Sequence, residues 1–213
     1  MDESGIQAAV VGERTELAEV LGRLSAAQWD QPSLCAGWRV REVVAHMTMP
    51  FRMSTMQFAG GMIRARGNFH RFADRQARAD TRRMGTADLL AQLRDNVEHP
   101  WRPPGGGSTG ALSHDVIHGL DITVALGIPR LVPVERVEVI LKSMTRRQMT
   151  YFGVDLSGIR LEATDLDWST GQGETLQARG QELLLVVAGR RLPAGLVMGR
   201  TAARFTESPG AVG

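Results

Sequence analysis

Apolar residues in the N-terminal part of the chain recur every three or four positions, which is the spacing of one face of an α-helix. The first such segment contains Leu17, Val20, Leu21 and Leu24. The same pattern predicts helices over about 6–24, from 39 onward, 86–97, 109–126 and 134–147. Together these segments predict a bundle of long helices.

Three segments between these helices differ from the periodic pattern. Pro50 is predicted to kink or interrupt the helix that begins near Arg39, because proline lacks the backbone N–H and its ring clashes with the preceding turn. The segment 69–83 is rich in arginine and alanine, which predicts a solvated helix or lid. The prolines and glycines of 100–108 predict a connecting loop that borders a pocket.

The pattern changes after Tyr151. Apolar and polar residues alternate in Ile159–Ala163, and Thr175–Ala178 is similar, so two strands are predicted. The glycine-rich stretch 169–173 is predicted to be a turn. Residues 181–188 are apolar nearly all round, which predicts a short buried helix.

These patterns predict a mainly α fold, with a helical bundle over 1–150 and a small α/β region over 151–213. A chain of 213 residues that is 43% hydrophobic can bury a sizeable core. A net charge of +2 gives no electrostatic case for nucleic acid as a partner. No apolar run approaches the roughly 20 residues of a membrane helix, and the N-terminus lacks a signal pattern. We therefore expect no membrane partner and a cytoplasmic location.

Five histidines and one cysteine supply the candidate chemistry. His114 and His118 stand four residues apart in a predicted helix, so their rings lie on one face and can point at one metal ion. A third ligand must come from elsewhere, and His46 is the best placed, because His70 lies in the arginine-rich segment and His99 at a frayed helix end. By itself, an H-x-x-x-H pair is also typical of histidines that bind no metal.

Cys35 is the only cysteine, so no internal disulfide can form. A buried structural role is predicted for it in preference to a catalytic thiol.

Several segments resemble a known family. Trp29 with Leu34–Trp38 and Val40–His46 resembles the N-terminal signature of the mycothiol-dependent maleylpyruvate isomerase-like proteins, which belong to the DinB/YfiT-like metal-binding superfamily. Val116–Ile122 resembles the second signature of this family. Four further segments resemble the small C-terminal region of the family, namely 159–165, 167–169, 182–185 and Ala188-Gly189-Arg190.

The resemblance implies a four-helix bundle that holds a divalent metal, with His46, His114 and His118 at the ligand positions. Three neutral imidazoles suit zinc best, with nickel as a possibility. The sequence departs from the family at two positions. His114 stands where many relatives carry glutamate, and Arg39 stands where relatives often have threonine or serine.

Three further residues are predicted to serve this site. Asp115 and Asp121 are predicted to accept an imidazole N–H and so fix the tautomer of a ligand histidine. The alternative is that these carboxylates are solvated or pair with arginines. Arg190 is a candidate for holding an anionic substrate, since guanidinium matches carboxylate geometry, and Arg200 and Arg204 compete for this role.

The resemblance implies an enzyme that uses mycothiol as cosubstrate, either a thiol S-transferase or an isomerase. Its partners would be a low-molecular-weight thiol and a small electrophile, and the chain would be a monomer or a homodimer. The alternative is a non-catalytic, metal-stabilised stress-response or interaction protein. A nucleic-acid regulator ranks third, because the helices show no basic recognition face.

Overall fold

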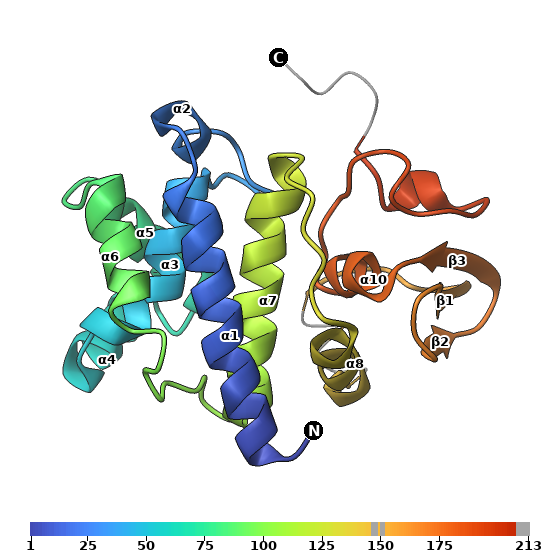
Figure 1. The fold of residues 1–213 in the computed structure, drawn as a ribbon, viewed down its shortest axis with the longest axis horizontal. Coiled ribbons are helices and arrows are strands. Elements are labelled where there is room, and N and C mark those ends of the chain that lie inside the picture. Colours follow the sequence, from blue (N-terminus) through green and yellow to red (C-terminus); the bar gives the residue numbers. More distant parts are fainter. Residues whose placement is uncertain (146–148, 150–151, 208–213) are drawn as a thin grey trace.

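Four helices form a central bundle in the computed structural model, which describes residues 1–145, 149 and 152–207. They are α1 (Glu3–Gly22), α3 (Val40–Arg52), α6 (Thr86–Arg94) and α7 (Gly107–Ala125). Helix α1 packs against α6 and α7, and α3 packs against the same two helices, which closes the bundle (Figure 1). The predicted mainly α fold with a four-helix bundle is confirmed.

Four further helices surround this bundle. They are α2 (Ala26–Trp29), α4 (Thr55–Arg64), α5 (Phe69–Thr81) and α8 (Val134–Ser143). Helix α5 packs along α3 and buries Phe72, Ala73 and Ala77, so the arginine-rich segment is solvated on one face only. The end of the helix predicted over 134–147 lies outside the described residues. So does the predicted boundary between the bundle and the C-terminal region, at 150–151.

Pro50 lies inside α3 and does not interrupt it, contrary to one of the two predicted effects. A proline at this position removes the N–H that would bind the carbonyl of His46, four residues earlier. The helix continues for two more residues and ends at Arg52, and the Met53 N–H donates to the Met49 carbonyl at 3.1 Å.

The C-terminal region contains three strands and a buried helix. The strands are β1 (Ile159–Ala163), β2 (Ser169–Gly171) and β3 (Glu174–Ala178), and the helices are α10 (Gly180–Val187) and the short 3₁₀-helix η1 (Ala202–Arg204). The sheet order is β2-β1-β3, with β1 antiparallel to β2 and parallel to β3. The predicted turn at 169–173 is corrected, because its first three residues pair with β1.

Two glycines allow the chain to pass from β2 to β3 across the start of β1. Gly171 and Gly173 have φ values of +84° and +121°, which favour glycine. A Cβ atom on Gly171 would collide with the carbonyl of Ile159, and one on Gly173 with the carbonyl of Gly158. The close crossing explains why this glycine-rich stretch resembles a simple turn in sequence.

Helix α7 belongs to two hydrophobic clusters and lies on the side of the bundle that faces the C-terminal region (Figure 1). On one side Ile122 packs with residues of α1, α3 and α6, including Leu17, Val43 and Leu89. On the other side Leu112, Val116 and Leu120 share a core with α8, α10 and the sheet. Among the described residues, no helix is both long and apolar enough to cross a membrane.

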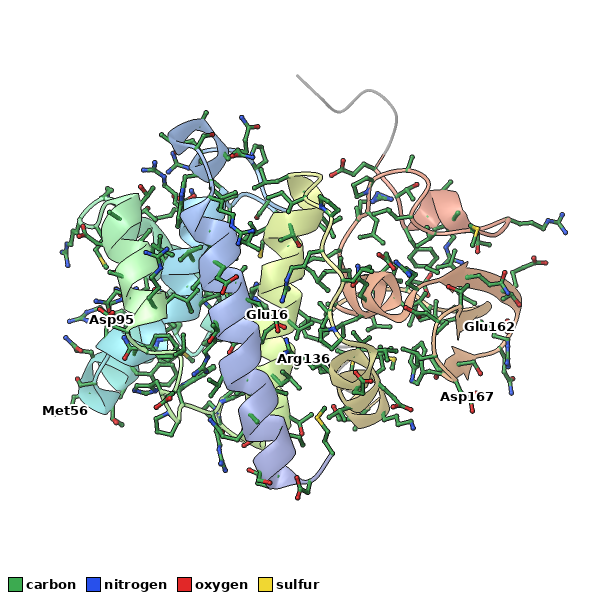
Figure 2. The ribbon with its side chains drawn as sticks, in the orientation of Figure 1. Glu16, Met56, Asp95, Arg136, Glu162 and Asp167 are labelled. Atoms are coloured by element: carbon green, nitrogen blue, oxygen red, sulfur yellow. The ribbon has the colours of Figure 1, made fainter. Side chains whose placement is uncertain are left out.

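A buried ion-pair network ties α1 to α8. Glu13 is fully buried and accepts hydrogen bonds from Arg130 at 2.8 Å and from Arg136 at 3.0 Å. Arg136 also pairs with Glu16 at 2.7 Å, and Figure 2 shows these two side chains meeting between α1 and α8. The network fixes the position of α8 against the bundle.

Glu13→Ala should destabilise the protein by about 3–5 kcal/mol, because it leaves two largely buried arginines without their shared carboxylate. Chemical denaturation followed by circular dichroism measures this change. Glu19→Ala is the matched control on the same helix, since Glu19 pairs with Arg23 at 3.6 Å on the exposed surface. It should cost no more than about 1 kcal/mol. Equal effects of the two substitutions would contradict a structural role for the buried network.

Candidate metal centre

Three histidines converge where α3 packs against α7. His46 comes from α3, and His114 and His118 come from adjacent turns of α7. The ring centroids are 5.2 Å apart for His46 and His114, 4.9 Å for His46 and His118, and 4.8 Å for His114 and His118. One ring nitrogen of each histidine lies within 4.8 Å of the other two. The structure thus brings together the three residues that the sequence selects.

The start of α3 determines where His46 lies along the bundle. Arg39 occupies the N-cap position, and its side chain makes no capping bond. Instead, the Glu42 carboxylate accepts the Arg39 backbone N–H at 3.0 Å and pairs with the Arg39 guanidinium at 2.7 Å. The helix start is therefore held by Glu42 in place of the hydroxyl that threonine or serine would supply.

Each histidine of α7 has a carboxylate partner. Nδ1 of His114 lies 2.8 Å from Asp115 Oδ1, and Nδ1 of His118 lies 3.0 Å from Asp121 Oδ2. A neutral imidazole that donates from Nδ1 keeps its lone pair on Nε2, where it can bind a metal. The geometry matches the predicted contacts of both carboxylates.

Both carboxylates also pair with arginines, so the two predicted alternatives occur together. Arg14 Nε donates to Asp115 at 2.7 Å. Arg190 donates from Nε and Nη2 to the two oxygens of Asp121, each at 2.8 Å, and from Nη1 to the Ala188 carbonyl at 2.9 Å. Since much of the Arg190 guanidinium is used within the protein, its contact with an anionic substrate stays a prediction.

The two competing arginines lie in the C-terminal region. Arg204 pairs with Asp155 at 3.1 Å, and Arg200 is 88% exposed beside Glu174. Neither makes a contact with the histidine cluster in the described part of the chain.

Burial keeps His46 and His118 neutral. It lowers the pKa of His46 well below its usual value, and the neighbouring His118 and His114 lower it further. Burial also lowers the pKa of His118, against the opposing effect of its bond with Asp121. Although burial alone would raise the pKa of Asp121, its bonds with Arg190 and His118 lower it, so this carboxylate stays ionised. Neutral imidazoles are the form that binds metal.

The buried Nδ1 of His46 has no hydrogen-bond partner among the described residues. Buried polar atoms are rarely left in this state. A role of His46 as a metal ligand would explain why it is buried without a carboxylate partner of its own. Three histidines are also a ligand set of catalytic zinc sites. The residues present therefore fit a divalent metal.

Aromatic side chains that the sequence did not assign to the site surround the histidines. Trp38 and Phe69 lie beside His46, with ring centroids at 5.1 Å and 6.3 Å, and Trp101 lies 5.1 Å from His114. Trp101 belongs to the loop that was expected to border a pocket. The only sequence signal for Trp38 was its place in the segment that resembles the N-terminal signature.

Cys35 also lies beside the candidate site, although only a buried structural role was predicted for it. Its Sγ is 3.7 Å from Arg190 Nη2, and it forms a possible ligand group with His118 and Asp121. Burial raises the pKa of Cys35 to about 11, so the thiol stays protonated at neutral pH. Since Asp121 is already bonded to Arg190 and His118, the three histidines are the better ligand set.

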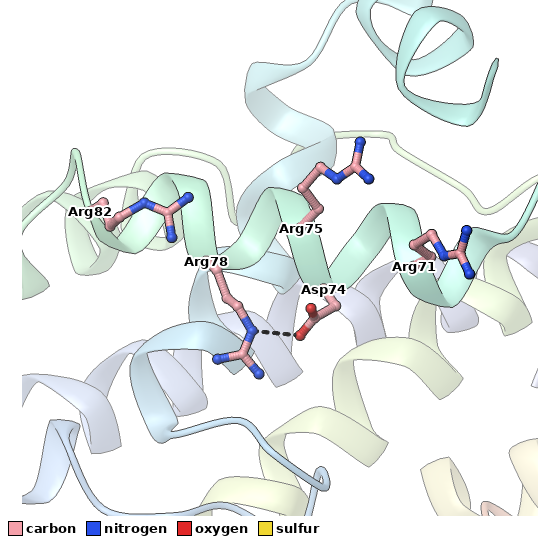
Figure 3. Close-up of a pocket in the computed structure, with 5 residues that line it drawn as sticks. All are labelled: Arg71, Asp74, Arg75, Arg78 and Arg82. Atoms are coloured by element: carbon pink, nitrogen blue, oxygen red, sulfur yellow. Dashed lines mark hydrogen bonds and ion pairs between the residues drawn. The ribbon is translucent and has the colours of Figure 1, made fainter. Parts of the chain in front are cut away.

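A surface hollow of about 460 Å³ lies outside the histidine cluster and is lined by Arg71, Asp74, Arg75, Arg78 and Arg82 (Figure 3). Arg78 pairs with Asp74 at 2.8 Å and donates to the Gly37 carbonyl, also at 2.8 Å. Asp74 in turn accepts the Trp38 indole N–H at 2.8 Å. This face of α5 therefore anchors Trp38 beside His46, although none of the three histidines lines the hollow.

Comparisons with known proteins give a family match for part of the chain and a fold match for nearly all of it. Residues 10–100 match the family model of the mycothiol maleylpyruvate isomerase N-terminal domain. The crystal structure of a mycothiol-dependent maleylpyruvate isomerase superposes with a TM-score of 0.56 at 13% identity, covering 98% of this chain and 95% of that chain. A mutant of that isomerase with one histidine replaced by alanine gives a TM-score of 0.55 at 11% identity over the same shares. No curated protein matches the sequence.

The fold and the histidine cluster define a helical bundle with a candidate metal centre. More particularly, residues 10–100 are similar to the N-terminal domain of mycothiol maleylpyruvate isomerase, and the solved isomerase structures share their fold with 98% of this chain.

The metal-free protein should lose stability as the pH falls through about 6.5, the ordinary histidine pKa. Because His46 and His118 have lowered pKa values when folded, the unfolded chain binds more protons than the folded chain just below this pH, and stability decreases. Urea unfolding midpoints on either side of about pH 6.5 measure the effect. The variant His46→Gln/His118→Gln should show a weaker pH dependence. An unchanged dependence would mean that other groups titrate.

Proposed function

We propose that this protein is a mycothiol-dependent enzyme in which His46, His114 and His118 hold one divalent metal ion, with zinc favoured and nickel as the alternative. The observation that supports it best is the convergence of three histidines from two packed helices, two of them with Nδ1 on a buried carboxylate. The match of residues 10–100 to the mycothiol maleylpyruvate isomerase N-terminal domain supports mycothiol as the cosubstrate.

A bound zinc ion lowers the pKa of a coordinated thiol, so the thiol is held as the nucleophilic thiolate. The protein supplies only three strong ligands in this arrangement, which is the number that catalytic zinc sites use. Asp115 and Asp121 hold His114 and His118 in the tautomer that presents Nε2. The histidines thus act as ligands and carry no proton in the reaction.

The surroundings of the histidines favour a small electrophile as the second substrate. Trp38, Phe69 and Trp101 present apolar ring surface beside His46 and His114, which excludes water from a bound ligand. Arg190 is the proposed contact for an anionic group of the substrate. If the sulfur adds to a carbon–carbon double bond, rotation about the resulting single bond and expulsion of the thiol give isomerisation. If the sulfur displaces a leaving group from an electrophilic carbon, the leaving group departs with the bonding electrons and the result is S-transfer.

One observation favours a non-catalytic alternative. Asp115 and Asp121 are each bonded to a histidine and an arginine, so neither is available as a general base. A metal-stabilised bundle without catalytic activity would need no such base. The experiments below distinguish the two functions.

The purified protein should contain about one divalent ion per chain, and His118→Ala should remove it, since two imidazoles are too few for stable binding. Elemental analysis measures the metal content. Metal removal should also lower the melting temperature of the wild-type protein, because an ion that binds only the folded state stabilises it. His70→Ala is the control and should retain the metal, since His70 lies on α5 outside the cluster. Full occupancy in His118→Ala would show that other residues are the ligands.

The metal-loaded protein should bind mycothiol in calorimetry and accelerate its reaction with a chromogenic electrophile, or the isomerisation of maleylpyruvate. His114→Ala should lose both metal and activity. If mycothiol does not bind and the reaction runs no faster than with free thiol, the enzyme proposal fails. A protein that still binds metal stoichiometrically would then be assigned the non-catalytic function.

A further inference from the structure

Arg14 is a fully buried arginine in the middle of α1 with a direct bond to a partner of the metal centre. Its Nε donates to Asp115 Oδ2 at 2.7 Å, while the other oxygen of Asp115 lies 2.8 Å from His114 Nδ1. We infer that Arg14 is a positioning residue that sets the affinity and geometry of the metal centre through Asp115 and His114. The inference rests on the proposed metal-binding function.

The other contacts of Arg14 hold its guanidinium in place and so fix the Asp115 carboxylate that it binds. Arg14 Nη1 donates to the carbonyls of His99 at 2.7 Å and Val97 at 3.3 Å, and its guanidinium lies 5.0 Å from the centre of the Phe51 ring. Because a planar guanidinium with these contacts cannot turn freely, the direction of its Nε–H is fixed. Asp115 has one oxygen on Arg14 and one on His114, so the orientation of the imidazole is fixed in turn.

Arg14 also holds a second group that contacts His114. The segment whose carbonyls it binds leads directly to Trp101, whose backbone N–H donates to His99 Nδ1 at 3.1 Å. The Trp101 ring lies 5.1 Å from the His114 ring. Arg14 therefore supports His114 on two sides, by a carboxylate and by an aromatic ring.

This arrangement suits a histidine at position 114 in particular. An imidazole ligand has an Nδ1–H that must find an acceptor in the buried site, whereas a carboxylate ligand has none. Asp115 is the acceptor, and it is only 2% exposed. A buried carboxylate needs a cation partner, and Arg14 is the cation that bonds to it.

The test compares metal binding by Arg14→Met with that by the wild type. We expect the dissociation constant for zinc, measured by competition with a chelator, to rise by about 10- to 100-fold, as for other residues that orient metal ligands. The visible spectrum of the cobalt-substituted protein should change as well, because it reports the ligand geometry. The Asp115→Asn variant should show the same two effects, and the double variant should be weakened little more than the stronger single one.

Arg130→Met is the matched control. Arg130 is also a largely buried arginine bonded to a carboxylate of α1, Glu13, but it does not contact the histidines or Asp115. It should lower stability while leaving the zinc affinity and the cobalt spectrum close to those of the wild type. If Arg14→Met does not fold, Asp115→Asn and Arg14→Lys, which retains the charge but not the planar group, provide the same comparison.

Unchanged affinity and spectrum in the Arg14 and Asp115 variants would overturn the inference, as would an equal loss of affinity in Arg130→Met. Absence of metal binding by the wild-type protein is a different result, and it would overturn the proposed function instead.

Discussion

Burial of two histidine–aspartate pairs on α7 is the constraint on which the arrangement of the other elements depends. Asp115 and Asp121 are almost completely buried, and an unpaired carboxylate in such a place would be strongly destabilising. The chain supplies one arginine to each, Arg14 from α1 and Arg190 from the segment after α10. The first and last parts of the chain must therefore both pack on α7 before its polar residues are satisfied. The C-terminal region is thereby linked to the centre through the bond between Arg190 and Asp121.

Apolar packing and polar pairing have different effects in this bundle. Residues such as Leu17, Val43 and Leu120 hold α1, α3 and α7 together, but apolar contacts alone leave the helices free to adjust along one another. The pairs formed by Asp115 and Asp121 have directional bonds and so fix the position of α7. His46 has no such pair and is placed by the packing of α3. A metal bound by all three histidines would connect these two differently held helices.

Helix positions in this structure can be predicted from the sequence, whereas the contacts between residues far apart in the chain cannot. Helix positions and the facing pair His114 and His118 follow from spacing, and His46 follows from the resemblance as well. Arg14 carries no local signal, because it is one of 24 arginines and stands 101 residues from Asp115. The strand β2 was missed because three residues beside a glycine turn show no alternation of their own. Arg190 was predicted to hold an anionic substrate, and this role stays a prediction. In the structure its guanidinium bonds to Asp121, a pairing that no pattern along the chain reveals.

The charges around the centre bear on which of the two proposed functions is the better one. Asp115 with Arg14 and Asp121 with Arg190 form pairs without net charge, and burial keeps His46 and His118 neutral. A divalent cation bound by these histidines would therefore keep its full charge in a largely buried place. Structural zinc sites commonly contain cysteine thiolates, which offset this charge. Here the only cysteine, Cys35, remains protonated, so the protein provides no compensating anion among the three proposed ligands. An external anionic ligand would complete the charge balance, and a thiolate is such a ligand. This electrostatic demand favours a centre that binds a thiol over one that serves stability alone.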